Sequence, residues 1–258
     1  MPPLFAASDI HGFRSEFRDA LRDAGLADAA GNWSGGDARL WLLGDYVDRG
    51  PDGIGVLDDI RRLAAQAPRT GGQVGALLGN HEALLLAVHR FGTEAVPGWE
   101  SYEGAWLRWG GQAGDLHRLT GDHIAWLHGL PAMALVGDHL LMHSDTTAYL
   151  EFGDSVAEVN AMVGRHLTDL DATDFLYFWG KLTSRGGLSA PGAAEKMLAT
   201  YGGGTLVHGH STLMTHFRVP ATAAHRYAGD RVIAVDGGVF EGGRILITEL
   251  TPPTPRDS

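Results

Sequence analysis

Five short apolar runs of this sequence each end in a polar residue of a kind that binds metals. The residues are Asp9 with His11, Asp45, Asn80, His143, and His208 with His210. In α/β proteins ligands gather outside the carboxyl ends of the strands, so we expect these side chains to converge. Each of them alone is as easily part of a polar turn or a hydrogen-bonded core histidine. Their joint occurrence predicts a metal site, and oxygen and imidazole donors suit Mn²⁺, Fe²⁺ or Zn²⁺.

Stretches with helical spacing of apolar residues separate these runs, and the alternation predicts an α/β fold. The chain has 258 residues and no low-complexity linker, so we expect a single domain spanning residues 1–258. The strand pattern stops over residues 91–130, where four of the seven tryptophans lie. This segment is either a helical insert over the mouth of the site or a plain packed flank. Residues 232–235 and 245–250 are expected to pair as strands, and residues 252–258 to form a flexible tail.

The composition narrows the classes of function. The chain contains no cysteine, which excludes disulfides and thiolate ligands. A formal net charge of −11 without a basic stripe argues against nucleic acid as a partner. No apolar run reaches the length that spans a bilayer, so we expect no membrane partner. The first candidate ligand is already Asp9, which leaves no room for a leader peptide before it, and we therefore expect a cytoplasmic protein.

The stretch over residues 44–50 follows an apolar run and carries two acids and an arginine, Asp45, Asp48 and Arg49. Unpaired carboxylates at the end of a buried strand carry a large desolvation cost, which metal ions would remove. The planar guanidinium of Arg49 is suited to gripping a phosphate group. A surface loop with a satisfied Asp/Arg pair is the simpler interpretation of this stretch taken alone.

Together the motifs resemble those of a known family. They are Asp9-Ile10-His11-Gly12, residues 44–50, Gly79-Asn80-His81-Glu82, Met142-His143 and His208-Gly209-His210. Their order resembles the PPP branch of the calcineurin-like metallophosphoesterases, and in particular the small bacterial and phage serine/threonine protein phosphatases and the symmetrical dinucleoside tetraphosphatases. The resemblance implies an α/β sandwich of two mixed β-sheets flanked by helices.

The resemblance also implies a site with two divalent metal ions, for which Mn²⁺ is expected and iron or zinc are alternatives. By motif position, Asp9 and His11 would hold one ion and Asp45 would bridge both. The second ion would be held by Asn80, His143 and His210. His208 is left as a neighbour of this set, because the family's ligand is the histidine that follows the glycine.

For the reaction, the resemblance implies that a hydroxide between the two metals attacks phosphorus. His81 would then protonate the leaving oxygen, with Asp48 orienting the imidazole. Arg49 would bind the phosphate oxygens. Arg185 is the candidate for a second phosphate-binding arginine, and a solvated loop arginine is the alternative for it.

These residues predict a metal-dependent phosphatase acting on phosphomonoesters, with phosphoserine and phosphothreonine proteins as the leading substrates and small phosphoesters as others. One alternative is a hydrolase of the pyrophosphate bond in dinucleoside tetraphosphates. The other is a non-catalytic module that binds a phosphorylated ligand. Ser8 stands where the family commonly has a glycine before the first aspartate, and it should be tolerated because serine is small. Ser144-Asp145 after His143 departs from the pattern of the eukaryotic members and leaves the preference for phosphoproteins open.

Overall fold

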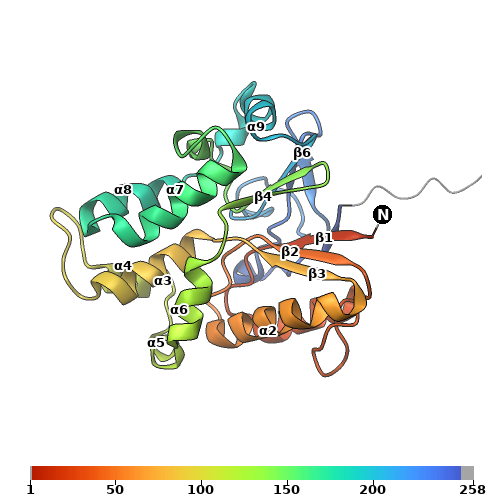
Figure 1. The fold of residues 1–258 in the computed structure, drawn as a ribbon, viewed down its shortest axis with the longest axis horizontal. Helices are drawn as coiled ribbons and strands as arrows, with labels where there is room; N and C mark the ends of the chain where they lie inside the picture. The colour runs from red at the N-terminus through yellow and green to blue at the C-terminus, as the bar shows by residue number, and fades with distance from the viewer. Residues whose placement is uncertain (1, 251–258) are drawn as a thin grey trace, which may run out of the picture.

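Two β-sheets form the centre of the molecule, and the computed structural model describes them within residues 2–250 (Figure 1). The expected tail at residues 252–258 lies outside the described residues. The first sheet has the order β3-β2-β1-β9. Its strands are β1 (Leu4–Ala7), β2 (Arg39–Leu42), β3 (Gln73–Ala76) and β9 (Thr248–Glu249). β1, β2 and β3 are parallel and β9 is antiparallel to β1, so the polar residues that follow the three parallel strands lie at one edge.

The second sheet has the order β4-β5-β6-β8-β7. Its strands are β4 (Met133–Val136), β5 (His139–Met142), β6 (Thr205–His208), β7 (His225–Tyr227) and β8 (Val232–Ala234). β5, β6 and β8 are parallel, and the antiparallel strands β4 and β7 form its edges. The hairpin between β4 and β5 turns at Gly137, whose φ of +61° requires the left-handed region that glycine favours.

The expected pairing of residues 232–235 with 245–250 is wrong. β8 is already paired on both sides, with β6 and with β7, so it offers no free edge. β1 has β2 on one side only, and β9 pairs on its other side, with Glu249 opposite Phe5. The chain between β8 and β9 therefore crosses from the second sheet to the first.

Apolar side chains from both sheets meet between them and form the inner core. This layer contains Leu4, Ala6, Leu43, Leu77, Ala134, Val136, Leu141, Val207, Ile233, Val235 and Leu250, all buried. Because side chains alternate along a strand, the opposite faces of the sheets must be covered as well. The helices cover them, and the result is a sandwich with helices outside.

The helices are α1 (Arg14–Asp23), α2 (Gly53–Gln66), α3 (Asn80–Phe91), α4 (Tyr102–Arg108), α5 (Ala113–Arg118), α6 (Gly121–His128), α7 (Val156–Asp169), α8 (Ala172–Thr183) and α9 (Ala193–Tyr201). α2 contacts β3 and α1, while α7 contacts β4 and α9 contacts β6. In Figure 1, α2 runs below the first sheet, and α7, α8 and α9 lie above it. Among residues 2–250, none of the helices has the length and apolar composition that crossing a lipid bilayer requires.

Residues 91–130 contain the three short helices α4, α5 and α6, with no strand among them. The segment is packed through its aromatic side chains. Tyr102 and Trp106 are completely buried, whereas Trp109 is 37% exposed. Tyr102 stacks on Phe91 of α3, with ring centroids 5.1 Å apart. The segment thus belongs to the core on one side and reaches the surface on the other.

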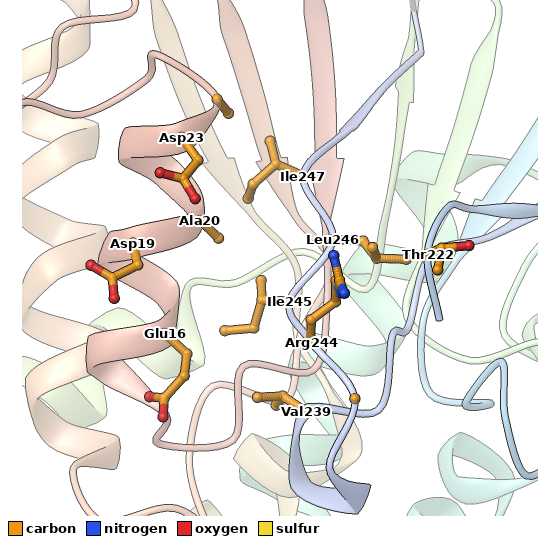
Figure 2. Close-up of a pocket in the computed structure, with 12 residues that line it drawn as sticks. Glu16, Asp19, Ala20, Asp23, Thr222, Val239, Arg244, Ile245, Leu246 and Ile247 are labelled. Atoms are coloured by element: carbon orange, nitrogen blue, oxygen red, sulfur yellow. The ribbon is translucent and has the colours of Figure 1, made fainter. Parts of the chain in front are cut away.

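A groove of about 610 Å³ lies between α1 and residues 243–247. Figure 2 shows the carboxylates of Glu16, Asp19 and Asp23 along α1, and Ile245 and Ile247 pointing toward that helix from the other side. One end of the groove is lined by residue 239, so the groove begins beside the turn that carries Phe240.

Candidate dinuclear metal centre

The polar residues singled out in the sequence lie at or just beyond the ends of β1, β2, β3, β5 and β6, and nearly all are buried. Arg185 instead follows α8 and is exposed. Their backbone is unusual. Of the nine non-glycine residues with positive φ in the described chain, six are candidate site residues: Asp9, His11, Asp45, Asp48, Arg49 and His210. Side chains with a Cβ rarely adopt this conformation, and such strain collects at functional sites because the surrounding structure imposes it. The loops are therefore held in the conformation that turns these side chains inward.

Asp45 lies at the middle of the cluster, between two groups of imidazoles. Its Oδ1 is 3.2 Å from His143 Nε2, and its Oδ2 is 3.6 Å from His11 Nε2 and 3.9 Å from His81 Nε2. Although burial opposes its charge, the neighbouring His143 and His81 rings hold the pKa of Asp45 well below its usual value. One carboxylate thus faces two potential metal positions, as a bridging ligand must.

Around Oδ1 of Asp45, hydrogen-bond acceptors face one another. His143 donates its Nδ1 hydrogen to the Leu43 carbonyl (2.8 Å), which leaves Nε2 directed at Asn80 Oδ1 (2.9 Å) and at Asp45. A neutral imidazole would bring three lone pairs together there, and a cation between them would relieve the repulsion. Despite the opposing effect of burial, Asp45 raises the pKa of His143 to about 9. Both observations fit a position that takes positive charge.

His210 completes this group. Its Nδ1 is buried and has no hydrogen-bond partner within residues 2–250, so a lone pair is free for a ligand. The backbone N–H of His210 donates to Asp9 Oδ2 (2.7 Å), which ties the loop after β6 to the loop after β1. On the far side of the ring, Nε2 lies 2.9 Å from the Thr183 carbonyl and 2.9 Å from Arg185 Nη1. The donor set Asp45, His143 and His210 can hold one divalent metal.

The second group is built on His11. Its Nδ1 donates to the Val47 carbonyl (3.1 Å), and its Nε2 lies 3.6 Å from Asp9 Oδ1 and 3.6 Å from Asp45 Oδ2. His81 also comes close enough to Asp45 and His11 to join this group geometrically. Asp9, His11 and Asp45 are the three that the motifs predict for a metal. The structure brings all six predicted ligands together.

The predicted proton donor and its partner form a tight pair. His81 Nδ1 donates to Asp48 Oδ2 at 2.6 Å, and Trp106 Nε1 donates to the other oxygen, Oδ1, at 2.6 Å. Burial disfavours the charged ring, but Asp45 and the hydrogen bond to Asp48 outweigh it, and the pKa of His81 is raised. His81 is thus poised to carry a proton, and Asp48 is clamped from both sides.

The two predicted phosphate-binding arginines flank the cluster on opposite sides. Arg49 Nη1 donates to His11 Nε2 (2.9 Å), and its Nη2 lies 3.3 Å from His81 Nε2. Its guanidinium stacks 3.8 Å above the ring centre of Phe240, a cation–π contact that fixes its plane. Arg185 contacts His210. His208 lies outside the cluster, since its nitrogens contact the Gly209 carbonyl (2.7 Å) and the Tyr227 hydroxyl (2.8 Å).

Glu82 is a residue to which the sequence reasoning gave no role. Its buried carboxylate accepts the backbone N–H groups of Asp45 (2.8 Å), Tyr46 (2.7 Å) and Gly79 (3.0 Å). Burial, and secondarily the Asp45 charge, raises the pKa of Glu82 to about 7. It binds the loop after β2 to the start of α3. The available signal was its position three residues after the cap of α3, where glutamate favours a capping box.

Three further residues support the site from distant parts of the chain. They are Trp106 on Asp48, Phe240 on Arg49, and Trp179, whose Nε1 donates to the Asn80 carbonyl (2.9 Å). No local pattern marks Trp106 and Trp179, because an aromatic residue at helical spacing predicts only packing.

A family model described as calcineurin-like phosphoesterase matches residues 2–213. The chain belongs to the calcineurin-like phosphoesterase family. The two-sheet α/β sandwich and the family that the motifs indicated are thereby confirmed. This family uses divalent metals, and the two His/Asp groups of the described residues agree with that.

Named relatives fall into two kinds. The calcineurin-like chain is 36% identical over 81 residues to Shewanella-like protein phosphatase 2 of Arabidopsis thaliana. This aligned stretch covers 31% of this chain and 21% of that protein. It is 32% identical over 141 residues to a symmetrical bis(5'-nucleosyl)-tetraphosphatase of Aromatoleum aromaticum, covering 55% of this chain and 43% of that protein. The chain thus spans less than half the length of these two curated relatives.

Solved structures share the fold over nearly the whole chain. A cold-active protein-tyrosine phosphatase from a Shewanella species superposes with a TM-score of 0.71 at 22% identity, covering 96% of this chain and 75% of that one. A protein serine/threonine phosphatase of Saccharomyces cerevisiae superposes with a TM-score of 0.57 at 13% identity, covering 92% and 67%. At such identities the likeness concerns the fold.

Proposed function

We propose that this calcineurin-like protein is a metal-dependent phosphatase that hydrolyses phosphomonoesters of serine and threonine in proteins. The observation that carries the proposal is the His81–Asp48 pair beside the acceptor-lined cluster. A module that only binds a phosphorylated ligand would need neither a proton donor nor a carboxylate to hold it charged.

The metal ligands in this proposal are Asp9, His11, Asp45, Asn80, His143 and His210, with Mn²⁺ as the expected ion. Their support is the convergence of lone pairs at Asp45 Oδ1, Asn80 Oδ1 and His143 Nε2, and the free Nδ1 of His210. When bound, a pair of divalent ions acidifies water and offsets negative charge on phosphate oxygens.

The chain's own residues bind, orient and protonate. Arg49 and Arg185, which each contact a ligand histidine, would donate hydrogen bonds to the non-bridging oxygens of the phosphate. His81 would donate its proton to the leaving oxygen, and Asp48 would keep the ring charged and correctly oriented. Asp48 is itself held by Trp106, so the donor has little freedom to turn away.

The proton donor favours an ester of a weakly acidic alcohol as the substrate. A serine or threonine alkoxide leaves poorly unless it is protonated, whereas a nucleotide leaving from a pyrophosphate bond is already a stable anion. A dinucleoside tetraphosphate is the second candidate substrate. It is favoured by the match to the tetraphosphatase, which extends over 141 residues against 81 for the protein phosphatase.

Purified protein should be loaded with Mn²⁺ and given an aryl phosphate, phosphoserine peptides and a dinucleoside tetraphosphate. We expect turnover of the first two substrates, and expect Asn80→Ala to reduce both metal content and activity. A preference for the tetraphosphate would select the second candidate. A protein that holds metal and hydrolyses none of the three substrates would be a binding module, and the proposed activity would be wrong.

A further inference from the structure

A second cavity includes Arg185, the candidate for a second phosphate-binding arginine. It has a volume of about 400 Å³, and its lining includes Asp145, Arg185, Gly186, Ser211, His216 and Arg218. Arg185 belongs to both places, since it lines the cavity and its Nη1 contacts the candidate ligand His210. A group bound in the cavity would therefore adjoin a phosphate held at the metal centre.

Positive charge predominates in this cavity, which two arginines and one carboxylate line. Within residues 2–250, Arg185 has one polar contact, with His210 Nε2 (2.9 Å), and neither it nor Arg218 has an ion-pair partner. The carboxylate of Asp145 is buried and committed, because Oδ1 accepts from Ser211 Oγ (2.9 Å) and Oδ2 from the Gly186 N–H (2.8 Å). The described residues thus give Arg218 no partner and Arg185 only His210, and the one carboxylate of the cavity already accepts two hydrogen bonds.

This arrangement differs from the other arginines that lie near acids. Arg14, for example, donates to Asp59 (2.8 Å) and to Asp52 (2.9 Å), and Arg118 donates to Asp52 (2.6 Å). Among the described residues, Arg185 and Arg218 have no ion pair and line one cavity together, and this combination favours an external anion as their partner. Arg218 also has a φ of +57°, so the loop holds it in a conformation that a plain surface residue seldom adopts.

We infer that this cavity, lined by Arg185, Arg218 and His216, binds a second anionic group of the substrate, adjoining the phosphate that is hydrolysed. The inference rests on the proposed function and makes it more specific. The anion is a carboxylate or phosphate beside the phosphorylated residue of a peptide, or another phosphate of a dinucleoside tetraphosphate. The chemistry is the same in both, and the substrates used below separate the two sources.

The test compares two phosphoserine peptides that differ only in having glutamate or glutamine on both sides of the phosphoserine. For the protein with its natural sequence, kcat/KM should be about tenfold higher for the glutamate peptide, the effect of a charge-assisted contact. Arg218→Gln should bring this ratio close to one, and Arg218→Glu should invert it. Raising the salt concentration should also lower the ratio, because the cavity is open to water.

Arg69→Gln is the matched control. Arg69 is exposed and precedes β3, at the opposite end of the sheet from the site, so the same change of charge there should leave the ratio unaltered. The dinucleoside tetraphosphate is measured against the aryl phosphate in the same variants. One outcome is that Arg218→Gln lowers the rate on the tetraphosphate relative to the aryl phosphate while the ratio between the two peptides stays the same. That result would identify a polyphosphate as the source of the anion.

A ratio that does not respond to either Arg218 variant, for peptides and tetraphosphate alike, would overturn the inference while leaving the phosphatase activity established. If no substrate is turned over, a binding measurement still tests the subsite. The two peptides carry a fluorescent label, and their binding to Mn²⁺-loaded protein is measured by fluorescence anisotropy. Tighter binding of the glutamate peptide that Arg218→Gln abolishes supports the subsite even without the activity. Equal binding, or none, refutes it.

Discussion

Replacing His81 with alanine tests the proton donor through the chemistry of the leaving group. The His81–Asp48 pair is buried, with its atoms 2.6 Å apart and Asp48 held by Trp106. A positioned general acid contributes about 10²–10⁴-fold to a rate. For a phosphoserine peptide, whose alkoxide must be protonated to leave, we expect His81→Ala to lower kcat by about this amount.

The same substitution should matter far less when the leaving oxygen needs no proton. For an aryl phosphate with a strongly acidic phenol, we expect the loss of kcat to be about tenfold or smaller. The assay is therefore a series of aryl phosphates of increasing phenol acidity, together with the peptide. In the variant, the logarithm of kcat/KM should depend more steeply on the acidity of the leaving group than in the natural protein.

Metal content should be measured in parallel, and His123→Ala is the matched control. His123 is a buried histidine on α6, and its Nε2 lies 3.0 Å from Asp58 Oδ1. It is not one of the candidate site residues, so its replacement should leave the dependence on the leaving group unchanged. An equal loss of kcat for all leaving groups in His81→Ala would refute the role of proton donor. Loss of bound metal would show instead that His81 is a ligand, which its 3.9 Å distance from Asp45 permits geometrically.

Three other predictions concern stability. Burial raises the pKa of Asp115 to about 6. Its carboxyl therefore opposes folding increasingly above the unfolded-state pKa of about 4, and the cost is complete above about pH 6. Asp115→Asn should raise the free energy of unfolding by about 1–3 kcal/mol at pH 7.5, and urea titration should find this gain about halved at pH 5. Burial opposes the charge of Asp59, but Arg14 and Arg18 depress its pKa below the usual value. The charged carboxylate therefore stabilises the folded protein above about pH 4, and this stabilisation is lost on acidification. Asp59→Asn should lower the free energy of unfolding by about 1.5–3 kcal/mol at pH 7 and by less at pH 3, and an equal loss at both pH values would contradict this account. Mn²⁺ at about one hundred times its Kd should raise the free energy of unfolding of the natural protein by about 2.7 kcal/mol, which thermal melts can measure. A chelator should remove this gain, and Asn80→Ala should largely abolish it.

Much of this architecture follows from short-range patterns. Apolar runs alternating with stretches of helical spacing predicted the α/β fold. The residue pair Gly137-Asp138 between two apolar runs is typical of a two-residue hairpin turn, and such a turn joins β4 to β5. The convergence of Asp9, Asp45 and His143 followed from a general property of parallel sheets, whose carboxyl ends share one edge. Such predictions succeed because each depends on a few neighbouring residues and on one geometric rule.

The tertiary structure alone decided the partners that come from far along the chain. β9 joins β1 because β8 has no open edge. Trp106 reaches Asp48 across 58 positions, and Phe240 covers Arg49 only because the chain crosses between the sheets before β9. Apolar and aromatic residues carry no local mark of the polar group they will meet, since burial is non-directional and many partners would satisfy it equally. The sequence therefore determined which groups can do chemistry, and packing determined which side chains hold them in position.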